Sequence, residues 1–285
     1  MPESSGAAHR RDLPRFVTSS GIEIPHVALG TWQMDGDVGR TAVAQGIRTG
    51  YRLIDTAQRY HNEVDVGRGV RESGVPREEL LLVSKLRGGD QEARQVRRSF
   101  LTSLRSLDTD YLDLYYIHWP LPMLGRYLES YEVLMELRAE GLIRAIAVSN
   151  FLPEHLESIH ARFGEYPEVN QVELHPGWPQ DEIRAFDAEH GIVTQGWGVA
   201  GRGKGIMDDG TLDAIAADHG VSAVEIALAW TVRKGVGAVA KSADEGRQRA
   251  NLAAPGIELS DKEVERIDAM PAVALGKDPA VNEEY

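Results

Sequence analysis

The sequence predicts an α/β fold in which eight parallel strands, each followed by a helix, close into a (β/α)8 or TIM barrel. Residues 80–85 and 112–118 are predominantly apolar runs that each end on an ionisable residue, which is typical of parallel strands covered on both faces. Such runs alternate with segments of helical periodicity, and eight pairs fit into the 285 residues, as a barrel of about 250 residues requires. An open doubly wound sheet is the alternative, although no GxGxxG motif follows the first strand.

The elements can be placed in order from their apolar periods and from the residues that end them. Core strands are expected at residues 27–31, 53–55, 80–85, 112–118, 143–148, 169–174, 192–194 and 236–240. Helices are expected at residues 39–49, 62–73, 91–107, 127–139, 180–190, 211–219, 223–233, 244–252 and 261–270, with a short helix that opens at residue 153. Within one of these helices, for example, Val96, Phe100 and Leu104 recur on one face. Gly50 and Gly141 follow helices as terminators.

Three segments are expected outside the repeated units. Residues 16–18 and 23–24 flank a turn at residues 19–21, which indicates a short N-terminal hairpin. The last helix is followed by a C-terminal tail, residues 272–285, and the small, polar residues 1–15 are expected to be flexible. Residues 1–285 are expected to form one domain.

Composition and charge exclude several classes of function. The formal net charge is −13, which argues against nucleic acid or an anionic membrane surface as a partner. The chain has no cysteine, so it forms no disulfides, thiolate metal sites or cysteine nucleophile. No apolar run approaches a membrane span in length, and the first residues lack the apolar region of a signal peptide. A cytoplasmic protein is therefore expected.

Three neighbouring strands carry ionisable residues at their carboxyl ends. Asp55, Lys85 and His118 end these strands, and Tyr60 lies on the loop after the first of them. Taken alone, Asp55 and Tyr60 are also explained by a capping acid and a surface phenol, but barrel strands bring their carboxyl ends to one rim, where active sites lie. A buried Lys85 needs a carboxylate partner such as Asp55. The Lys85 ammonium favours the phenolate of Tyr60, lowering a pKa that is about 10 in water. The cluster thus predicts a proton donor for work near neutral pH.

The chain resembles the aldo-keto reductases over residues 24–259. The segments that carry the resemblance are LIDTAQRYHNE, LLVSK, YLDLYYIHWP, GLIRAIAVSNF, NQVELHP and KSADEGRQRAN, in the order found in that family. A further segment, WGVAGRGK, resembles the bacterial branch that includes the 2,5-diketo-D-gluconate reductases.

The resemblance implies an NADPH-dependent oxidoreductase that reduces aldehydes or ketones of small metabolites to alcohols by direct hydride transfer. In that pattern Tyr60 is the general acid. Lys85, paired with Asp55, lowers the pKa of this phenol, and His118 orients the carbonyl group. The nicotinamide supplies the hydride, so no metal is expected.

The resemblance also assigns residues to the cofactor. Ser149, Asn150 and Gln171 would hold the carboxamide, and Trp197 would stack on the nicotinamide. Residues 198–203 would offer backbone N–H groups to the pyrophosphate. The structural alternatives are that Asn150 caps the helix opening at residue 153 and that Trp197 is a core residue; the VSNF segment and the glycines beside Trp197 favour the cofactor roles. The full set expected to bind the cofactor is Thr31, Trp32, Asp55, Ser149, Asn150, Gln171, Trp197, Gly198, Ala200, Gly203, Lys241, Ser242, Arg247 and Asn251.

The segment after the last strand predicts the preferred cofactor. Lys241, Ser242 and Arg247 lie at or near a helix N-terminus and suit a 2′-phosphate, so NADPH is expected. Asp244 opposes a phosphate at this place, which leaves NADH as the alternative. We expect the Asp244 carboxylate to lie on a mobile loop and to swing away.

The substrate pocket is expected to be shallow, open and able to accept several small carbonyl compounds. Trp32, Tyr60, His118 and Trp119 are its expected substrate contacts, the two indoles forming apolar walls. The family resemblance implies a monomer. A cofactor-sensing subunit with little turnover is the alternative function, and the complete catalytic set argues against it.

Overall fold

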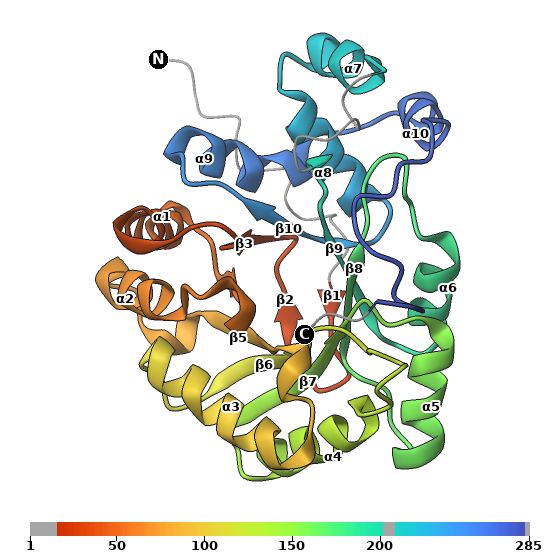
Figure 1. Cartoon of the computed structure of the whole chain (residues 1–285). Helices are drawn as coiled ribbons and strands as arrows, with labels where there is room; N and C mark the ends of the chain where they lie inside the picture. Colours follow the sequence, from red (N-terminus) through yellow and green to blue (C-terminus); the bar gives the residue numbers. More distant parts are fainter. Residues whose placement is uncertain (1–15, 202–208, 283–285) are drawn as a thin grey trace.

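The computed structural model describes residues 16–201 and 209–282. In this part of the chain eight parallel strands form a closed barrel (Figure 1). They are β3 (Val27–Gly30), β4 (Leu53–Asp55), β5 (Leu81–Leu86), β6 (Leu112–Ile117), β7 (Ile143–Ser149), β8 (Val169–Glu173), β9 (Val193–Trp197) and β10 (Gly237–Lys241). The predicted barrel is confirmed. Residues 1–15, expected to be flexible, lie outside the described range.

Helices surround the barrel on its outside (Figure 1). They are α1 (Gly36–Thr49), α2 (Glu63–Ser73), α3 (Ala93–Leu107), α4 (Tyr127–Ala139), α5 (Pro153–Phe163), α6 (Asp181–Glu189), α7 (Thr211–His219), α8 (Ala223–Arg233), α9 (Glu245–Ala253) and α10 (Asp261–Asp268). Two begin with a capping box, in which Ser222 or Ser260 accepts a hydrogen bond from the backbone of the Glu three residues later. This arrangement satisfies backbone N–H groups that a helix start leaves without partners.

The strands pack on both faces because their side chains alternate between two cores. Tyr115 and Ile117 of β6 belong to the outer core between barrel and helices. Leu114 and Tyr116 of the same strand belong to the inner core inside the barrel. This arrangement explains why the strand is apolar at consecutive positions, Asp113 excepted, rather than only at alternate ones.

A hairpin closes the amino-terminal end of the barrel. Strands β1 (Phe16–Val17) and β2 (Glu23–Ile24) pair antiparallel, as the sequence predicts. Phe16 and Ile24 are buried in the inner core. The hairpin covers this end of the barrel. The cavity that holds the candidate site therefore opens at the opposite end, where the strands have their carboxyl ends.

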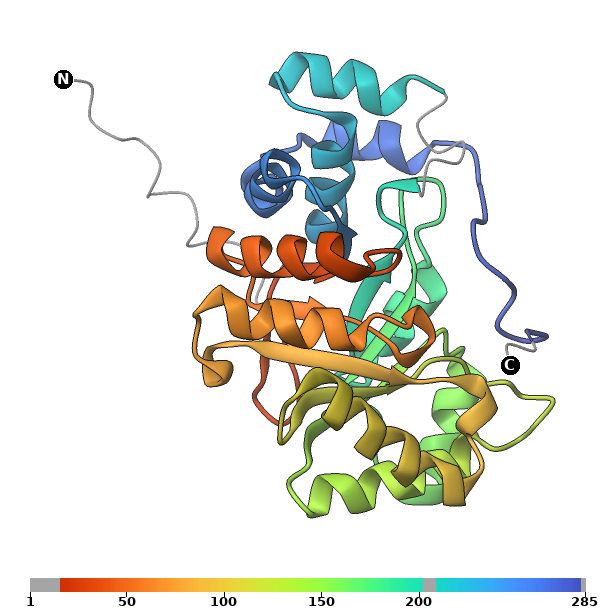
Figure 2. The same ribbon diagram turned by 60° about the vertical axis from the view of Figure 1, so that its left-hand side comes forward.

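The described part of the C-terminal tail, residues 272–282, crosses that opposite end. Figure 2 shows it running down one side of the barrel after α10. No helix among the described residues is long and apolar enough to span a membrane.

One strand, β9, extends well past its predicted end. The expected strand at residues 192–194 is β9, which extends to Trp197 because Glu173 and Trp197 are still paired across β8 and β9. The glycines around Trp197 obscured this pairing in the sequence.

Candidate active site

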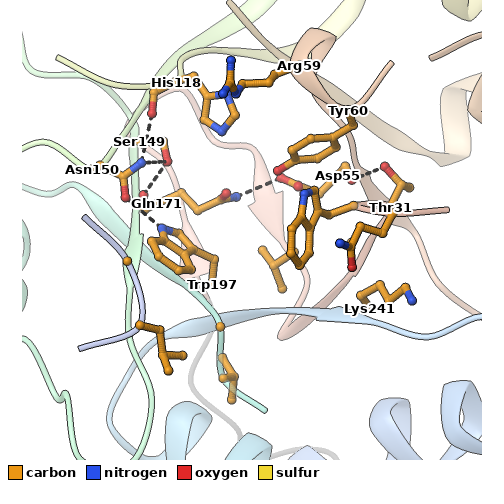
Figure 3. A pocket seen from close by; sticks show the side chains of 18 of the residues that line it. Thr31, Asp55, Arg59, Tyr60, His118, Ser149, Asn150, Gln171, Trp197 and Lys241 are labelled. Atoms are coloured by element: carbon orange, nitrogen blue, oxygen red, sulfur yellow. Dashed lines mark hydrogen bonds between the residues drawn. The ribbon is translucent and has the colours of Figure 1, made fainter. Parts of the chain in front are cut away.

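The predicted catalytic residues meet at the carboxyl ends of the strands. Asp55 is the last residue of β4, Lys85 lies near the end of β5, and His118 directly follows β6. Tyr60 ends a short 3-10 helix, η2 (Gln58–Tyr60), on the loop after β4. Figure 3 shows Asp55, Tyr60 and His118 around one cavity.

A buried ion pair forms the base of the cluster. Lys85 Nζ lies 2.6 Å from Asp55 Oδ1 and also donates a hydrogen bond to the Thr56 carbonyl at 3.1 Å. Burial alone would lower the pKa of Lys85, but its attraction to Asp55 and Tyr60 outweighs burial and raises that pKa above its ordinary value. The Lys85 side chain is therefore an ammonium at neutral pH.

Tyr60 lies against both of its predicted partners. Lys85 Nζ is 5.3 Å from the centre of the Tyr60 ring. The rings of Tyr60 and His118 meet edge to face with centroids 5.9 Å apart. The phenol is thus placed between the buried ammonium and the imidazole.

Asn62 holds the loop that carries Tyr60, a role that sequence analysis missed. Its Nδ2 donates hydrogen bonds to the carbonyls of Thr31 (2.7 Å) and Met34 (3.0 Å), and its Oδ1 accepts one from Thr56 Oγ1 at 3.1 Å. The amide is fully buried, so these bonds join the loops after β3 and β4. Asn62 lies in the segment LIDTAQRYHNE, but apolar periodicity gives no signal for a side chain that hydrogen-bonds one loop to another.

Asn150 is part of the cavity wall and does not cap a helix. Its Nδ2 donates to the His118 carbonyl and to Ser149 Oγ, both at 3.0 Å, and its Oδ1 accepts from Trp197 Nε1 at 2.9 Å. The residue at the N-cap of α5 is Leu152. The capping alternative for Asn150 is therefore excluded.

Gln171 connects this amide group to the ion pair. Its Nε2 donates to Asp55 Oδ2 at 2.9 Å and to Gln195 Oε1 at 3.0 Å, while its carbonyl accepts from Ser149 Oγ at 2.8 Å. Residues from four strands are thereby linked across the barrel mouth, as the dashed lines in Figure 3 partly show.

A cavity of about 740 Å³ opens over these residues. The predicted residues that line it are Thr31, Trp32, Asp55, Tyr60, His118, Trp119, Ser149, Asn150, Gln171, Trp197, Gly198, Ala200 and Lys241. Lys85 lies beneath the cavity, fully buried.

Of the predicted cofactor residues that the structure describes, three do not line the cavity. The buried Ser242 hydroxyl hydrogen-bonds the backbone of Asp244, and Arg247 is exposed on α9. Asn251 is buried on α9. Gly203 lies outside the described residues.

Asp244 does not lie on a mobile loop, contrary to expectation. It is the N-cap of α9, where its Oδ1 accepts a hydrogen bond from the Arg247 backbone N–H at 2.8 Å. The same carboxylate oxygen lies 3.8 Å from the Arg247 side chain. An acid at this place is stabilised by the helix start, so it holds its position instead of swinging away.

The C-terminal tail adds wall residues that sequence analysis did not assign. Leu275, Gly276, Lys277 and Asn282 line the cavity, as does Arg59 on the loop before Tyr60. The position of Arg59 next to Tyr60 was the usable signal in the sequence for a residue that lines the cavity. The tail has no periodicity from which its residues could be placed there. Over the described residues no group of three potential metal ligands is found.

Comparisons with known proteins agree with this geometry. The family model described as Aldo/keto reductase family matches residues 26–272. An aldo-keto reductase of Mycolicibacterium smegmatis is 39% identical over 267 residues, which are 93% of this chain and 97% of the relative. A Corynebacterium sp. protein named 2,5-diketo-D-gluconic acid reductase B is 38% identical over 277 residues, 96% of this chain and 99% of the relative. Among solved structures, a variant of Gox0644 in complex with NADPH has a TM-score of 0.89 at 33% identity, covering 95% of this chain and 99% of that one.

The match spans nearly the whole barrel, and the motifs that carried the resemblance lie where the geometry places the site. The relatives are reductases, and one structural neighbour holds NADPH. The chain therefore belongs to the aldo/keto reductase family, and it is an NAD(P)H-dependent oxidoreductase.

Proposed function

We propose that this protein reduces small aldehydes and ketones to alcohols, with Tyr60 as the proton donor and NADPH as the preferred cofactor. The observation that carries the proposal is the fully buried Lys85–Asp55 ion pair, 2.6 Å between Nζ and Oδ1, set against the Tyr60 ring. A buried ammonium beside a phenol stabilises the phenolate that remains when the phenol gives up its proton.

His118 and the two indoles complete the substrate side. His118 is nearly buried and borders the Tyr60 ring, so its imidazole can donate a hydrogen bond to the same carbonyl oxygen that Tyr60 protonates. Trp32 is 38% exposed and Trp119 is 8% exposed, and both line the cavity. These rings favour the apolar part of a small substrate and help to exclude water. All of these groups come from one chain, which supports a catalytic monomer.

The residues present fit a nicotinamide cofactor. The cavity combines an amide cluster around Asn150 and Gln171 with the indole of Trp197 and the exposed Lys241 side chain. Amide and hydroxyl groups suit a carboxamide, an indole suits a flat ring, and a lysine suits a phosphate. When bound, the cofactor supplies a hydride to the carbonyl carbon. Thr31, Ser149, Gly198 and Ala200 are the remaining wall residues that we propose to touch it.

Lys241 and Arg247 support NADPH over NADH. Lys241 ends β10, and Arg247 lies in the first turn of α9 beyond Ser242. Two cations near a helix start favour a 2′-phosphate. The fixed Asp244 carboxylate weakens this preference, so we propose that NADH is also accepted, with lower affinity.

A turnover assay tests the proposal. The parent protein is given NADPH and a panel of small aldehydes and α-dicarbonyl compounds, and cofactor oxidation is followed by absorbance. Tyr60→Phe is expected to lower kcat by about two to four orders of magnitude and to leave NADPH affinity, measured by fluorescence titration, unchanged. Tyr111→Phe is the control, because Tyr111 precedes β6 at the other end of the barrel and packs on Arg77.

Two results would reject the proposal. If Tyr60→Phe turns over the panel as fast as the parent, Tyr60 is not the proton donor. If the parent binds NADPH and reduces no compound of the panel, the cofactor-sensing alternative is supported instead.

A further inference from the structure

The C-terminal tail is fastened to the barrel mouth by Glu173. The Glu173 carboxylate accepts hydrogen bonds from the backbone N–H groups of Leu275 and Gly276, the latter at 2.6 Å, and lies 3.0 Å from His175 Nε2. Burial alone would raise the pKa of Glu173, but the bonds from His175 and the two tail amides lower it below its ordinary value. Glu173 is therefore ionised at neutral pH, and its bonds to the tail are charge-assisted and strong.

Close packing holds the tail in one position. A Cβ atom on Gly276 would lie 2.5 Å from Glu173 Oε2 and 2.6 Å from Trp197 Cη2, so a larger residue here would have to displace one of these side chains. Further back, Val273 N–H donates to the Gly177 carbonyl at 3.2 Å. The tail is thus pressed against β8, β9 and the loop after β8 rather than lying loosely over them.

A turn then directs the end of the tail into the cavity. Asp278 Oδ1 accepts a hydrogen bond from Ala280 N–H at 2.9 Å, and its carbonyl accepts one from Val281 N–H at 3.2 Å. Val281 is 65% exposed, whereas the next residue, Asn282, is 4% exposed and lines the same cavity as Tyr60.

The Asn282 amide is buried without using its hydrogen-bonding capacity. Within the part of the chain that the structure describes, neither its Oδ1 nor its Nδ2 has a hydrogen-bond partner. Buried side-chain amides nearly always have partners, because an unpaired buried polar group is costly. An unpaired amide on the wall of a substrate cavity is therefore a candidate for contact with a ligand.

We infer that Asn282 is a specificity-determining residue that hydrogen-bonds a hydroxyl group of the carbonyl substrate, an inference that rests on the proposed function. A primary amide presents one acceptor and one donor, and a hydroxyl group both donates and accepts. An alkyl group satisfies neither amide atom. A carboxylate can accept a hydrogen bond from Nδ2, but it is repelled by the partial negative charge of Oδ1. The substrates that this site favours are therefore hydroxylated aldehydes and ketones.

The expected selectivity follows from the cost of an unpaired amide. A site built to hydrogen-bond a substrate hydroxyl discriminates against an analogue that lacks it, because the protein group is then left without a partner. We expect the parent to reduce at least one hydroxylated aldehyde with a kcat/KM about tenfold higher than that of its alkyl counterpart.

The test compares matched substrate pairs with NADPH. Glycolaldehyde is paired with propanal, and hydroxylated aldehydes of three to five carbons are each paired with the alkyl aldehyde of the same size. Asn282→Leu, which keeps the branched shape of the side chain, is expected to lower the best hydroxylated-to-alkyl ratio of kcat/KM by about tenfold, mainly through KM. Asn282→Asp keeps an acceptor for the hydroxyl group and is expected to retain most of the preference. Val281→Ala, at the exposed neighbouring position, is expected to leave the ratio as in the parent.

Each alternative result overturns the inference. If the parent shows no preference in any pair, or if folded Asn282→Leu keeps the parent's ratio, Asn282 does not read a hydroxyl group. If Asn282→Leu instead raises the KM for NADPH and leaves the ratio unchanged, the amide serves the cofactor. A parent that reduces no carbonyl compound overturns the proposed function and this inference together. Should Asn282→Leu fail to fold by circular dichroism, Asn282→Ala takes its place in the same comparison.

Discussion

Replacing Asp187 by Asn is expected to stabilise the protein at pH 8. Asp187 lies in α6 and is fully buried. Its carboxylate accepts a hydrogen bond from Thr194 Oγ1 at 2.8 Å and one from Asn170 Nδ2 at 3.4 Å. Among the described residues it takes part in no ion pair, and burial, only partly offset by the two hydrogen bonds, raises its pKa from 3.8 to about 7.

The direction and size of the effect follow from this shift. In the unfolded chain the carboxyl group ionises near pH 3.8, whereas in the folded protein it keeps its proton until about pH 7. The folded state binds more protons between these values, so its stability falls as the pH rises through this window. A shift of about three pH units at about 1.4 kcal/mol per unit makes the loss up to about 4 kcal/mol. The Asp187→Asn side chain does not titrate and escapes this loss.

The assay is urea unfolding of parent and variant from pH 4 to pH 8. The difference between their free energies of unfolding is the quantity of interest, because the contributions of other titrating groups cancel in it. This difference is expected to shift in favour of Asp187→Asn by up to about 4 kcal/mol toward pH 8. Asp113→Asn is the control: Asp113 is equally buried but pairs with Arg77 at 2.8 Å and Arg144 at 2.7 Å, so loss of its charge is expected to destabilise the protein. A difference that stays constant with pH would refute the assignment of a raised pKa to Asp187.

Further substitutions probe the cofactor site, the buried ion pair and the C-terminal tail. Asp244→Asn keeps a good N-cap residue and removes a half-exposed charge, so the ratio of NADPH to NADH affinity is expected to rise by about threefold in cofactor titrations. Lys241→Ala is expected to lower this ratio. An unchanged ratio in both variants would place the 2′-phosphate elsewhere. Lys85→Met leaves the Asp55 carboxylate buried without its cation and is expected to lower the free energy of unfolding by about 3 kcal/mol. If adding Asp55→Asn to this variant restores none of the lost stability, the broken ion pair is not the cause of the loss. Glu173→Gln weakens the hydrogen bonds from the Leu275 and Gly276 backbone amides. Trypsin is therefore expected to cut the variant after the exposed Lys277 several times faster than it cuts the parent. Equal cutting rates would show that Glu173 does not hold the tail.

The barrel and the meeting of Asp55, Lys85 and His118 at its rim could be predicted from the sequence because both are encoded locally. Apolar runs identify parallel strands, and closure of the barrel brings strand ends to one rim wherever the strands lie along the chain. The ends of three such runs therefore sufficed to bring Asp55, Lys85 and His118 together. The length of β9 was less accessible, since its pairing through Trp197 depends on the neighbouring strand β8.

Only the tertiary structure decided the position of the C-terminal tail and the hydrogen-bond partners of the Glu173 and Asp244 carboxylates. Glu173 and Leu275 are 102 positions apart, and neither lies in a pattern that names the other. Asp244 could be seen to oppose a phosphate, but whether its carboxylate turned to solvent or capped α9 depended on where the helix began. Periodic apolar residues determine which face of an element is buried by their spacing alone. A hydrogen bond from an irregular segment depends on distances of a few tenths of an ångström, and these are set only when the barrel has closed and the tail has packed across it.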